Sequence, residues 1–272
     1  MSTQSNYRLS SVYESLLLPL YIRAQETARP DAILKDDWAV ELIGKLNLEG
    51  TQFTQAQVSE EVQVSILLRN RHFDQLTQDF LSHYDDARVV YLGCGLDARF
   101  ERVDNQKVEW FDLDLPEVIQ LRQELMGVES CRYHLLGCSV LDHAWMDQAS
   151  DPHPLPTLFM AEGLFMFFTQ SQVNQLVLAI KARFPNSELI FDAFSPFYAW
   201  GNNRRVARTN IGAKANWALK DPRLLEYWAD GIHLVSTWYP FLQVEPRLAH
   251  IRWARFLPFL AKTTGIFHYR LG

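Results

Sequence analysis

Hydrophobic residues follow two different periods along the chain, and the period changes near residue 87. Before it, apolar residues recur at spacings of three, four and seven, as on one helical face; they include Val62, Ile66, Phe73, Leu76 and Phe80. After it, short continuous apolar runs predict buried strands; these cover residues 89–92, 108–113, 133–136, 157–161 and 188–193. Helical patterns at 117–126 and 171–184 lie between several of the runs. Alternating strands and helices predict an α/β fold with a parallel sheet covered on both faces.

The last third of the chain is less regular. Residues 202–220 are polar, and three later runs at 232–238, 250–256 and 266–271 are typical of further strands. We therefore expect one domain over residues 1–272. It would have a helical N-terminal extension at 1–86, an α/β core at 87–272 and an insertion at about 198–230.

Composition narrows the class of protein. The chain has 272 residues and a net charge of −6, so nucleic-acid binding is not expected, because it depends on basic patches. The apolar stretches are too short to span a bilayer and the N-terminus lacks the apolar core of a secretory signal. We therefore expect a cytoplasmic protein without a membrane partner. The three cysteines and eight histidines show no metal-ligand spacing, so no metal site is expected.

The strongest motif is the run VVYLGCGLDAR at 89–99, where a predicted strand meets a glycine loop. Gly93 and Gly95 lack β-carbons, which lets the backbone turn tightly and approach a ligand closely. Asp114 ends the next strand, about 20 residues further on, where an acid accepts hydrogen bonds from a ribose diol. Glu162 ends the fourth strand and would face the same crevice, because ligands bind beyond the carboxyl ends of parallel strands. These residues predict a site for a nucleoside cofactor.

Two cofactors satisfy this pattern. Gly93, Gly95 and Ala98 match the G-x-G-x-x-A fingerprint of NAD-dependent oxidoreductases. Asp97 argues against NAD, because a carboxylate there would oppose the charge of a pyrophosphate. S-adenosylmethionine carries an ammonium and a cationic sulfonium, and it suits an acid-rich site better. An NAD-dependent oxidoreductase and a non-catalytic cofactor-binding protein remain as alternatives.

Seven segments of the chain are similar, in order and spacing, to those of a known family. They are SLLLPLYIRA at 15–24, RNRHFD at 69–74, GCGLDAR at 93–99, WFDLDLP at 110–116, SVLD at 139–142, AEGL at 161–164 and FDAFSP at 191–196. Together they resemble the leucine carboxyl methyltransferase family, and most closely its bacterial branch, which includes a polyketide carboxyl O-methyltransferase.

The resemblance implies a class I methyltransferase fold: a Rossmann-like, doubly wound sheet of seven strands whose final strand is antiparallel. It also implies S-adenosyl-L-methionine as methyl donor and S-adenosyl-L-homocysteine as product. Carried over by position, Arg69 would bind the methionine carboxylate and Gly93 would lie against the cofactor. Asp114 would hold the ribose hydroxyls, and Glu162 would face the methionine ammonium.

The adenine end of the implied site departs from the family pattern. Ser139 and Val140 would flank the adenine, but many relatives carry Asp where this chain has Ser139. The contact there would be weaker or would move to Asp142. Aromatic residues follow the fourth and fifth strands. About half of them would line the substrate crevice and the others would pack in the core; they are Phe165, Phe167, Phe168, Phe194, Phe197, Tyr198 and Trp200.

The function that the resemblance implies is S-adenosylmethionine-dependent O-methylation. The acceptor would be a carboxylate, or a phenolic hydroxyl, of a small acidic or aromatic molecule of polyketide type. The carboxyl group at a protein C-terminus is the alternative. A carboxylate is ionised at neutral pH and needs no general base, whereas a hydroxyl does. No catalytic residue is assigned from the sequence.

Overall fold

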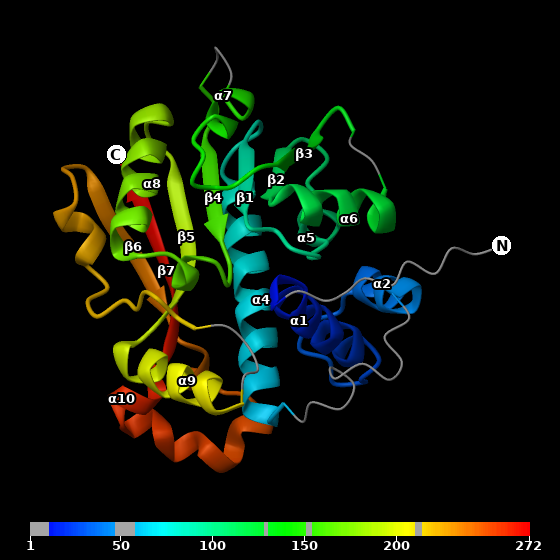
Figure 1. Ribbon diagram of the computed structural model, residues 1–272, viewed down its shortest axis with the longest axis vertical. Coiled ribbons are helices and arrows are strands. Elements are labelled where there is room, and N and C mark those ends of the chain that lie inside the picture. The colour runs from blue at the N-terminus through cyan, green and yellow to red at the C-terminus, as the bar shows by residue number, and fades with distance from the viewer. Residues whose placement is uncertain (1–10, 47–57, 128–129, 151–153, 210–213) are drawn as a thin grey trace.

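A seven-stranded sheet forms the centre of the molecule (Figure 1). The computed structural model describes residues 11–46, 58–127, 130–150, 154–209 and 214–272. The strand order is β3-β2-β1-β4-β5-β7-β6, in which β1 to β5 pair in parallel and β7 runs antiparallel to both of its neighbours. The strands are β1 (Arg88–Leu92), β2 (Glu109–Asp114), β3 (Tyr133–Gly137), β4 (Thr157–Ala161), β5 (Glu188–Phe194), β6 (Ile232–Trp238) and β7 (Thr264–Leu271). The predicted seven-stranded, doubly wound sheet with an antiparallel last strand is confirmed.

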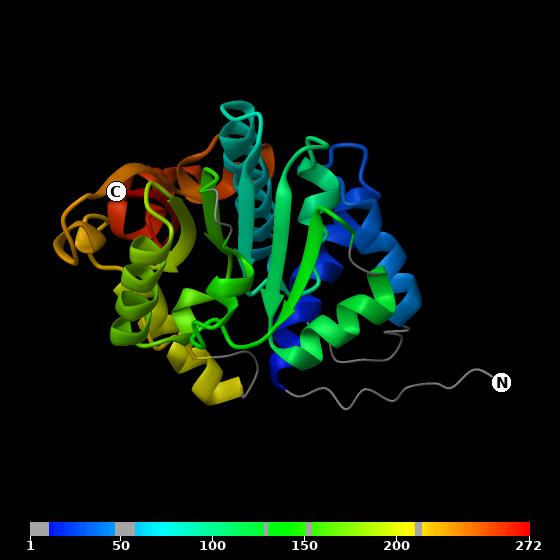
Figure 2. The same cartoon turned by 90° about the horizontal axis from the view of Figure 1, so that it is seen from above.

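Helices cover both faces of the sheet (Figure 2). Side chains along a strand alternate between faces, so Val89 and Tyr91 pack into one hydrophobic layer while Val90 and Leu92 pack into the other. The longer helices are α1 (Ser11–Thr27), α2 (Asp37–Leu46), α4 (Glu60–Ser82), α6 (Pro116–Met126), α8 (Gln170–Arg183) and α9 (Pro196–Thr209). The shorter α-helices are α5 (Arg99–Val103), α7 (Trp145–Gln148) and α10 (Pro258–Ala261). The 3₁₀ helices are η1 (Phe165–Phe167), η2 (Leu224–Tyr227), η3 (Pro240–Leu242) and η4 (Pro246–Phe256). Within the described ranges, no helix combines the length and apolarity needed to cross a lipid bilayer.

Two sequence predictions about elements are wrong. Residues 250–256 belong to η4 and not to a strand, because Leu248 and Ile251, three residues apart as on a helical face, pack against α4. Val62 lies on the exposed side of α4, whose buried residues near it are Val64, Leu67 and Leu68. The buried stripe of this helix is therefore rotated from the predicted one in its first turns.

The N-terminal helices pack beside the glycine loop. Leu17 and Leu20 of α1 and Leu42 of α2 form a small core with Leu96, which follows the loop, and Leu121 of α6. The predicted extension at 1–86 also contains residues 1–10 and 47–57, and the predicted insertion contains 210–213; these lie outside the described residues. The packing places α1 against the edge of the sheet where β1 and β2 end.

Candidate functional site

A cavity of about 470 Å³ lies beyond the carboxyl ends of β1, β2 and β4. The strand order reverses at β1, and such a switch point is where open α/β sheets bind ligands. All seven residues proposed from the sequence line this cavity: Arg69, Gly93, Gly95, Asp114, Ser139, Val140 and Glu162. The fold therefore brings together residues that lie up to 93 positions apart in the chain.

The glycine loop lines the cavity at the carboxyl end of β1. Gly93 and Gly95 have φ values of +69° and +54°, a backbone region that other residues rarely adopt. A β-carbon on Gly93 would lie 2.9 Å from a methyl of Leu164, and one on Gly95 would lie 3.0 Å from a methyl of Leu16. Both positions thus need glycine for the turn and for the close approach of α1 and of the loop after β4.

Asp114 fixes this loop while keeping acceptor capacity for a ligand. Its two carboxylate oxygens accept hydrogen bonds from the backbone N–H groups of Gly95, at 2.8 Å, and Leu115, at 2.7 Å. Burial raises the pKa of the Asp114 carboxyl, and these two hydrogen bonds oppose the rise. A carboxylate has about four acceptor positions, so about two remain for a pair of hydroxyls.

Asp112, on the same face of β2, has a structural role. Its carboxylate accepts from Arg122, from the Trp110 indole at 2.8 Å and from the Tyr133 hydroxyl at 2.6 Å. Arg122 also donates to the backbone carbonyl of Gly95 at 2.7 Å. Asp112 therefore supports the glycine loop from behind through Arg122.

Arg69 and Glu162 form an ion pair across the cavity wall. Arg69 Nε donates to Glu162 Oε1 at 2.8 Å, and its Nη1 donates to Asp192 Oδ2 at 3.0 Å. The other Asp192 oxygen accepts from the Gly163 N–H at 2.6 Å. Burial lowers the pKa of Arg69, but the charges of Asp192 and Glu162 outweigh it and raise that pKa above its ordinary value. Arg69 on α4 is thereby joined to the ends of β4 and β5.

Glu162 is held by three donors. Oε1 accepts from Arg69 and from Asn70 Nδ2, and Oε2 accepts from Arg99 Nη2 at 2.7 Å. About one of its four acceptor positions remains, on Oε2. That position suits the expected contact with an ammonium.

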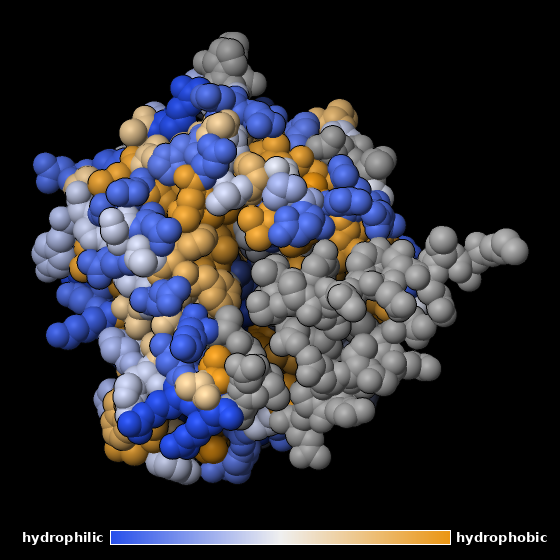
Figure 3. Space-filling view, viewed as in Figure 1, coloured by the Kyte–Doolittle hydropathy of each residue, from blue (hydrophilic) through white to orange (hydrophobic). Residues whose placement is uncertain are grey.

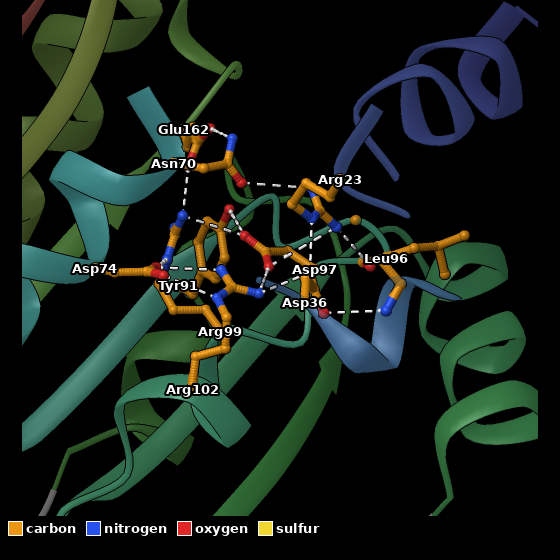
Figure 4. A network of polar contacts seen from close by, with 12 residues as sticks. Arg23, Asp36, Asn70, Asp74, Tyr91, Leu96, Asp97, Arg99, Arg102 and Glu162 are labelled. Carbon is orange, nitrogen blue, oxygen red and sulfur yellow. Dashed lines mark hydrogen bonds and ion pairs between the residues drawn. The ribbon is translucent and has the colours of Figure 1, made fainter. Parts of the chain in front are cut away.

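A buried polar network extends from Glu162 to the N-terminal helices (Figure 4). Arg23 of α1 donates to Asp36 at 2.8 Å and to the carbonyl of Leu96 at 3.2 Å. Arg102 of α5 bonds Asp97 at 2.9 Å and also Asp36 and Asp74. Sequence reasoning did not single out Arg23, which also lines the cavity; its position within the SLLLPLYIRA segment was the available signal.

The sequence argument against a pyrophosphate assumes an uncompensated negative charge on Asp97. In the structure, the charge of this carboxylate is compensated. It is within ion-pair distance of Arg23, Arg99 and Arg102. Burial raises its pKa, but these three cations outweigh burial and hold the pKa of Asp97 well below its ordinary range. The choice of cofactor therefore has to come from other observations.

The end of the cavity predicted to hold the adenine lies after β3. Cys138, Ser139 and Val140 line it, whereas Asp142 is exposed, is not part of the wall and accepts from the Ala144 N–H. Ser139, and not Asp142, thus lies in the cavity wall. Val140 is buried and offers an apolar surface to a flat ring.

Another part of the cavity wall is apolar. It consists of Leu16 and Pro19 of α1, with Leu164, Met166, Phe167 and Phe168 after β4. Of the aromatic residues expected here, Phe167 and Phe168 line the cavity, Phe165 is buried in the core, and Phe197 and Trp200 are exposed on α9. Clusters of metal-ligating side chains are absent from the part of the chain that is described.

The residues present fit S-adenosylmethionine. Two left-handed glycines permit close approach, Asp114 has acceptor positions for a ribose diol, and Glu162 has one for an ammonium. A guanidinium carries five donors, and two of those of Arg69 are used in the ion pairs. A group that can accept hydrogen bonds from an ammonium thus lies beside a group that can bind a carboxylate. The zwitterionic methionine end of S-adenosylmethionine requires both.

Comparison with known proteins identifies the family. The model of the leucine carboxyl methyltransferase family matches residues 17–181. The tetracenomycin polyketide synthesis O-methyltransferase of Streptomyces glaucescens is 31% identical over 85% of this chain and 84% of its own. An S-adenosyl-L-methionine-dependent methyltransferase of Gibberella zeae is 28% identical over 82% and 80%. In fold, a DUF574 family protein from Streptomyces avermitilis superimposes with a TM-score of 0.60 at 14% identity, over 94% of this chain and 96% of that one.

These findings select S-adenosylmethionine over NAD as the cofactor, and the oxidoreductase alternative is set aside. The seven-stranded sheet with its antiparallel β7 and the cavity at the switch point agree with that assignment. The chain belongs to the leucine carboxyl methyltransferase family and is an S-adenosylmethionine-dependent methyltransferase of class I fold.

Proposed function

We propose that the protein methylates a carboxylate oxygen of a small apolar or aromatic acid, with a phenolic oxygen as the second acceptor. The observation that carries this proposal is the lining of the cavity. Of the described residues in that lining, none is a histidine or a lysine. A carboxylate acceptor is already ionised at neutral pH, so it fits a site without a neutral base.

The titratable groups in the lining support the same proposal. Glu162 and Asp97 are tied to arginines. Burial raises the pKa of the Tyr91 hydroxyl and of the Cys94 thiol well above their ordinary values. Asp114 is bonded to two backbone N–H groups. None of these five groups is a free general base near pH 7, because three are held by donors and the raised pKa values keep Tyr91 and Cys94 protonated.

The chain would contribute orientation and exclusion of water. The cofactor supplies an electrophilic methyl group on its sulfonium. Asp114 would hold the ribose, Arg69 and Glu162 the amino-acid end, and Ser139 and Val140 the adenine. The apolar wall at Leu164, Met166 and Phe167 would seat the body of the acceptor and keep water from its oxygen. These contributions are worth most when the acceptor is apolar apart from one carboxylate.

Radiolabelled methyl transfer tests the proposal. The protein is incubated with S-adenosylmethionine labelled in the methyl group and with paired acceptors: an aromatic acid, its amide, and the matching phenol. Label that appears with the acid and is released as methanol by mild alkali identifies a methyl ester. Label that resists alkali identifies a phenolic ether and the second acceptor.

Two outcomes contradict the carboxylate proposal. One is methylation of the amide as fast as of the acid. The other is a rate that rises with pH through a single pKa near 6.5, the ordinary value of histidine, because an ionised acceptor needs no base. Methylation of a protein C-terminus but of no free acid would support the alternative acceptor instead.

A further inference from the structure

Positive charge is concentrated in two segments that follow β5 and precede β7. Residues 196–209 and 246–262 contain no Asp or Glu, in a chain whose net charge is −6. Their cations are Arg204, Arg205, Arg208, Arg247, Arg252, Arg255 and Lys262. The two segments are thus positively charged, whereas the whole chain is negatively charged. Six of the seven cations are exposed, and Arg247 is largely buried and paired with Glu26. We call the exposed residues of these two segments the basic aromatic patch.

One face of helix α9 packs against the protein, and the opposite face is exposed to solvent. Ala199 and Val206 are buried, and Asn203 is bonded to the backbone of Ala215. Phe197, Trp200, Arg204 and Arg208 recur every three or four residues on the other side, and all four are exposed. The Arg204 guanidinium lies over the Trp200 ring at 4.3 Å from its centroid. The exposed face therefore combines large rings with cations.

The second segment continues the same chemistry. Along η4 and α10, Trp253, Phe256, Leu257 and Phe259 are exposed, and Phe256 is 72% exposed. Arg255 lies over the Phe256 ring at 4.8 Å. A monomeric protein rarely leaves such a run of large apolar side chains in water without an interaction to bury them.

The two segments meet in space. The rings of Phe197 on α9 and Phe259 on α10 lie 5.9 Å apart, edge to face. The Ser195 N–H, just before α9, donates to the Thr263 carbonyl, just after α10. Both segments form the lower end of the molecule in Figure 1, and over α9 and α10 strongly hydrophilic atoms lie beside hydrophobic ones in Figure 3.

The basic aromatic patch borders the wall of the cavity. Ala199 on the inner face of α9 belongs to a cluster with Met166, and Phe167 packs against that cluster. Met166 and Phe167 also line the cavity. One helix thus separates the basic aromatic patch from the proposed acceptor wall.

We propose that the basic aromatic patch binds the surface of an anionic lipid bilayer. Aromatic rings settle at the level of lipid headgroups, and arginines gain attraction from anionic lipids. A second copy of this chain using the same surface would bring six exposed cations against six, which repulsion opposes. The expectation of no membrane partner came from the lack of a spanning segment, and a peripheral contact needs none. The binding does not depend on which acceptor is methylated.

Vesicle co-sedimentation tests the proposal with the full chain. Vesicles of phosphatidylglycerol and phosphatidylcholine, and of phosphatidylcholine alone, are compared at low and high salt. We expect binding to the anionic vesicles only, and release by 0.5 M salt. The triple variant Arg204→Glu, Arg208→Glu, Arg255→Glu should lose about 100-fold or more in partition coefficient. The variants Trp200→Ser and Phe256→Ser should each lose about tenfold.

Matched controls separate the basic aromatic patch from general exposure and charge. Tyr227 on η2 is 75% exposed and Arg223 is an exposed arginine, and both lie outside it. Tyr227→Ser and Arg223→Glu should bind vesicles as the unaltered protein does. Thermal midpoints should be the same in all variants, because the substituted side chains are exposed. The affinity for S-adenosylhomocysteine should also be the same, because these side chains lie outside the cavity.

Three results would overturn the proposal. The first is no sedimentation with anionic vesicles at low salt. The second is equal partition of the patch variants and the two controls. The third is equally tight binding to a soluble polyanion such as heparin or DNA, or to an acidic protein without vesicle binding, which would assign the surface to a different class of partner.

Discussion

Arg69→Ala is expected to lower both the stability of the fold and the affinity for the cofactor. The substitution removes the cation shared by Asp192, whose side chain is fully buried, and Glu162. Breaking a buried ion pair costs about 3–5 kcal/mol. Glu162 retains Asn70 and Arg99 as donors, so the lower end of that range applies, about 3 kcal/mol.

The loss of stability should depend on pH through Asp192. Burial already raises the pKa of this carboxyl, and Arg69 opposes the rise; without Arg69 the folded-state pKa rises further above the unfolded value near 3.9. The folded state then binds the proton more tightly than the unfolded state. The penalty therefore grows as pH increases from about 4 through the folded pKa. Urea unfolding of both proteins should show a smaller difference at pH 5 than at pH 8, and a difference without this slope would contradict the mechanism.

The effect on binding is measured by calorimetry with two ligands. S-adenosylhomocysteine carries the methionine carboxylate, whereas methylthioadenosine lacks it. Loss of a bidentate, charge-assisted pair corresponds to about 2–3 kcal/mol, or roughly 30- to 150-fold in Kd. Arg69→Ala should show that loss for the first ligand only, and Arg69→Lys a smaller one, because an ammonium cannot form two parallel bonds. Equal losses for both ligands would mean that Arg69 only supports the fold, and no loss for either would refute its role in binding.

Three further substitutions probe other parts of the cavity. Asp114→Ala should weaken S-adenosylhomocysteine binding by about 2–4 kcal/mol, measured by calorimetry; an unchanged Kd would show that Asp114 does not hold the ribose. Gly95→Val should abolish binding and lower the thermal midpoint, because it combines a φ of +54° with a methyl of Leu16 only 3.0 Å from the new β-carbon; retained binding would mean that the loop relocates. Asp97→Asn should cost about 3–5 kcal/mol of unfolding free energy. That cost should be equal at pH 5 and pH 8, because the folded pKa of Asp97 is held so low that its contribution is lost only in strong acid.

Strands were predictable because their local pattern and their environment agree. The runs at 157–161 and 232–238 match β4 and β6 residue for residue, and the other strands differ by one or two residues at their ends. The error at 250–256 has a tertiary cause. Alternating large and polar residues there imitate a strand, but Leu248 and Ile251 pack against α4 at a helical spacing, and the segment forms η4 at the surface.

The residues of the candidate site also divide into those that a local sequence pattern predicts and those that it does not. Gly93, Gly95, Asp114 and Glu162 could be found because strand ends carry them and parallel strands end at one edge. Arg69 came only from the family resemblance. Its partners lie 93 and 123 residues away in the chain, and no local pattern encodes such contacts. Of the three cations around Asp97, only Arg23 is distant in the chain; Arg99 and Arg102 follow it closely, but the sequence does not show that they turn back toward it.

The place of β7 in the sheet has a consequence for the order of synthesis. β7 lies between β5 and β6, although both precede it in the chain. Until residues 264–271 have been made and have inserted, β5 keeps an open edge and β6 has no neighbour in the sheet. Open strand edges invite pairing with other chains, so the nascent protein passes through a period of exposure that ends only when residues 264–271 insert. Protection of this open edge of β5 from other chains is therefore needed until the last strand has inserted, later than for any strand pair between β1 and β5.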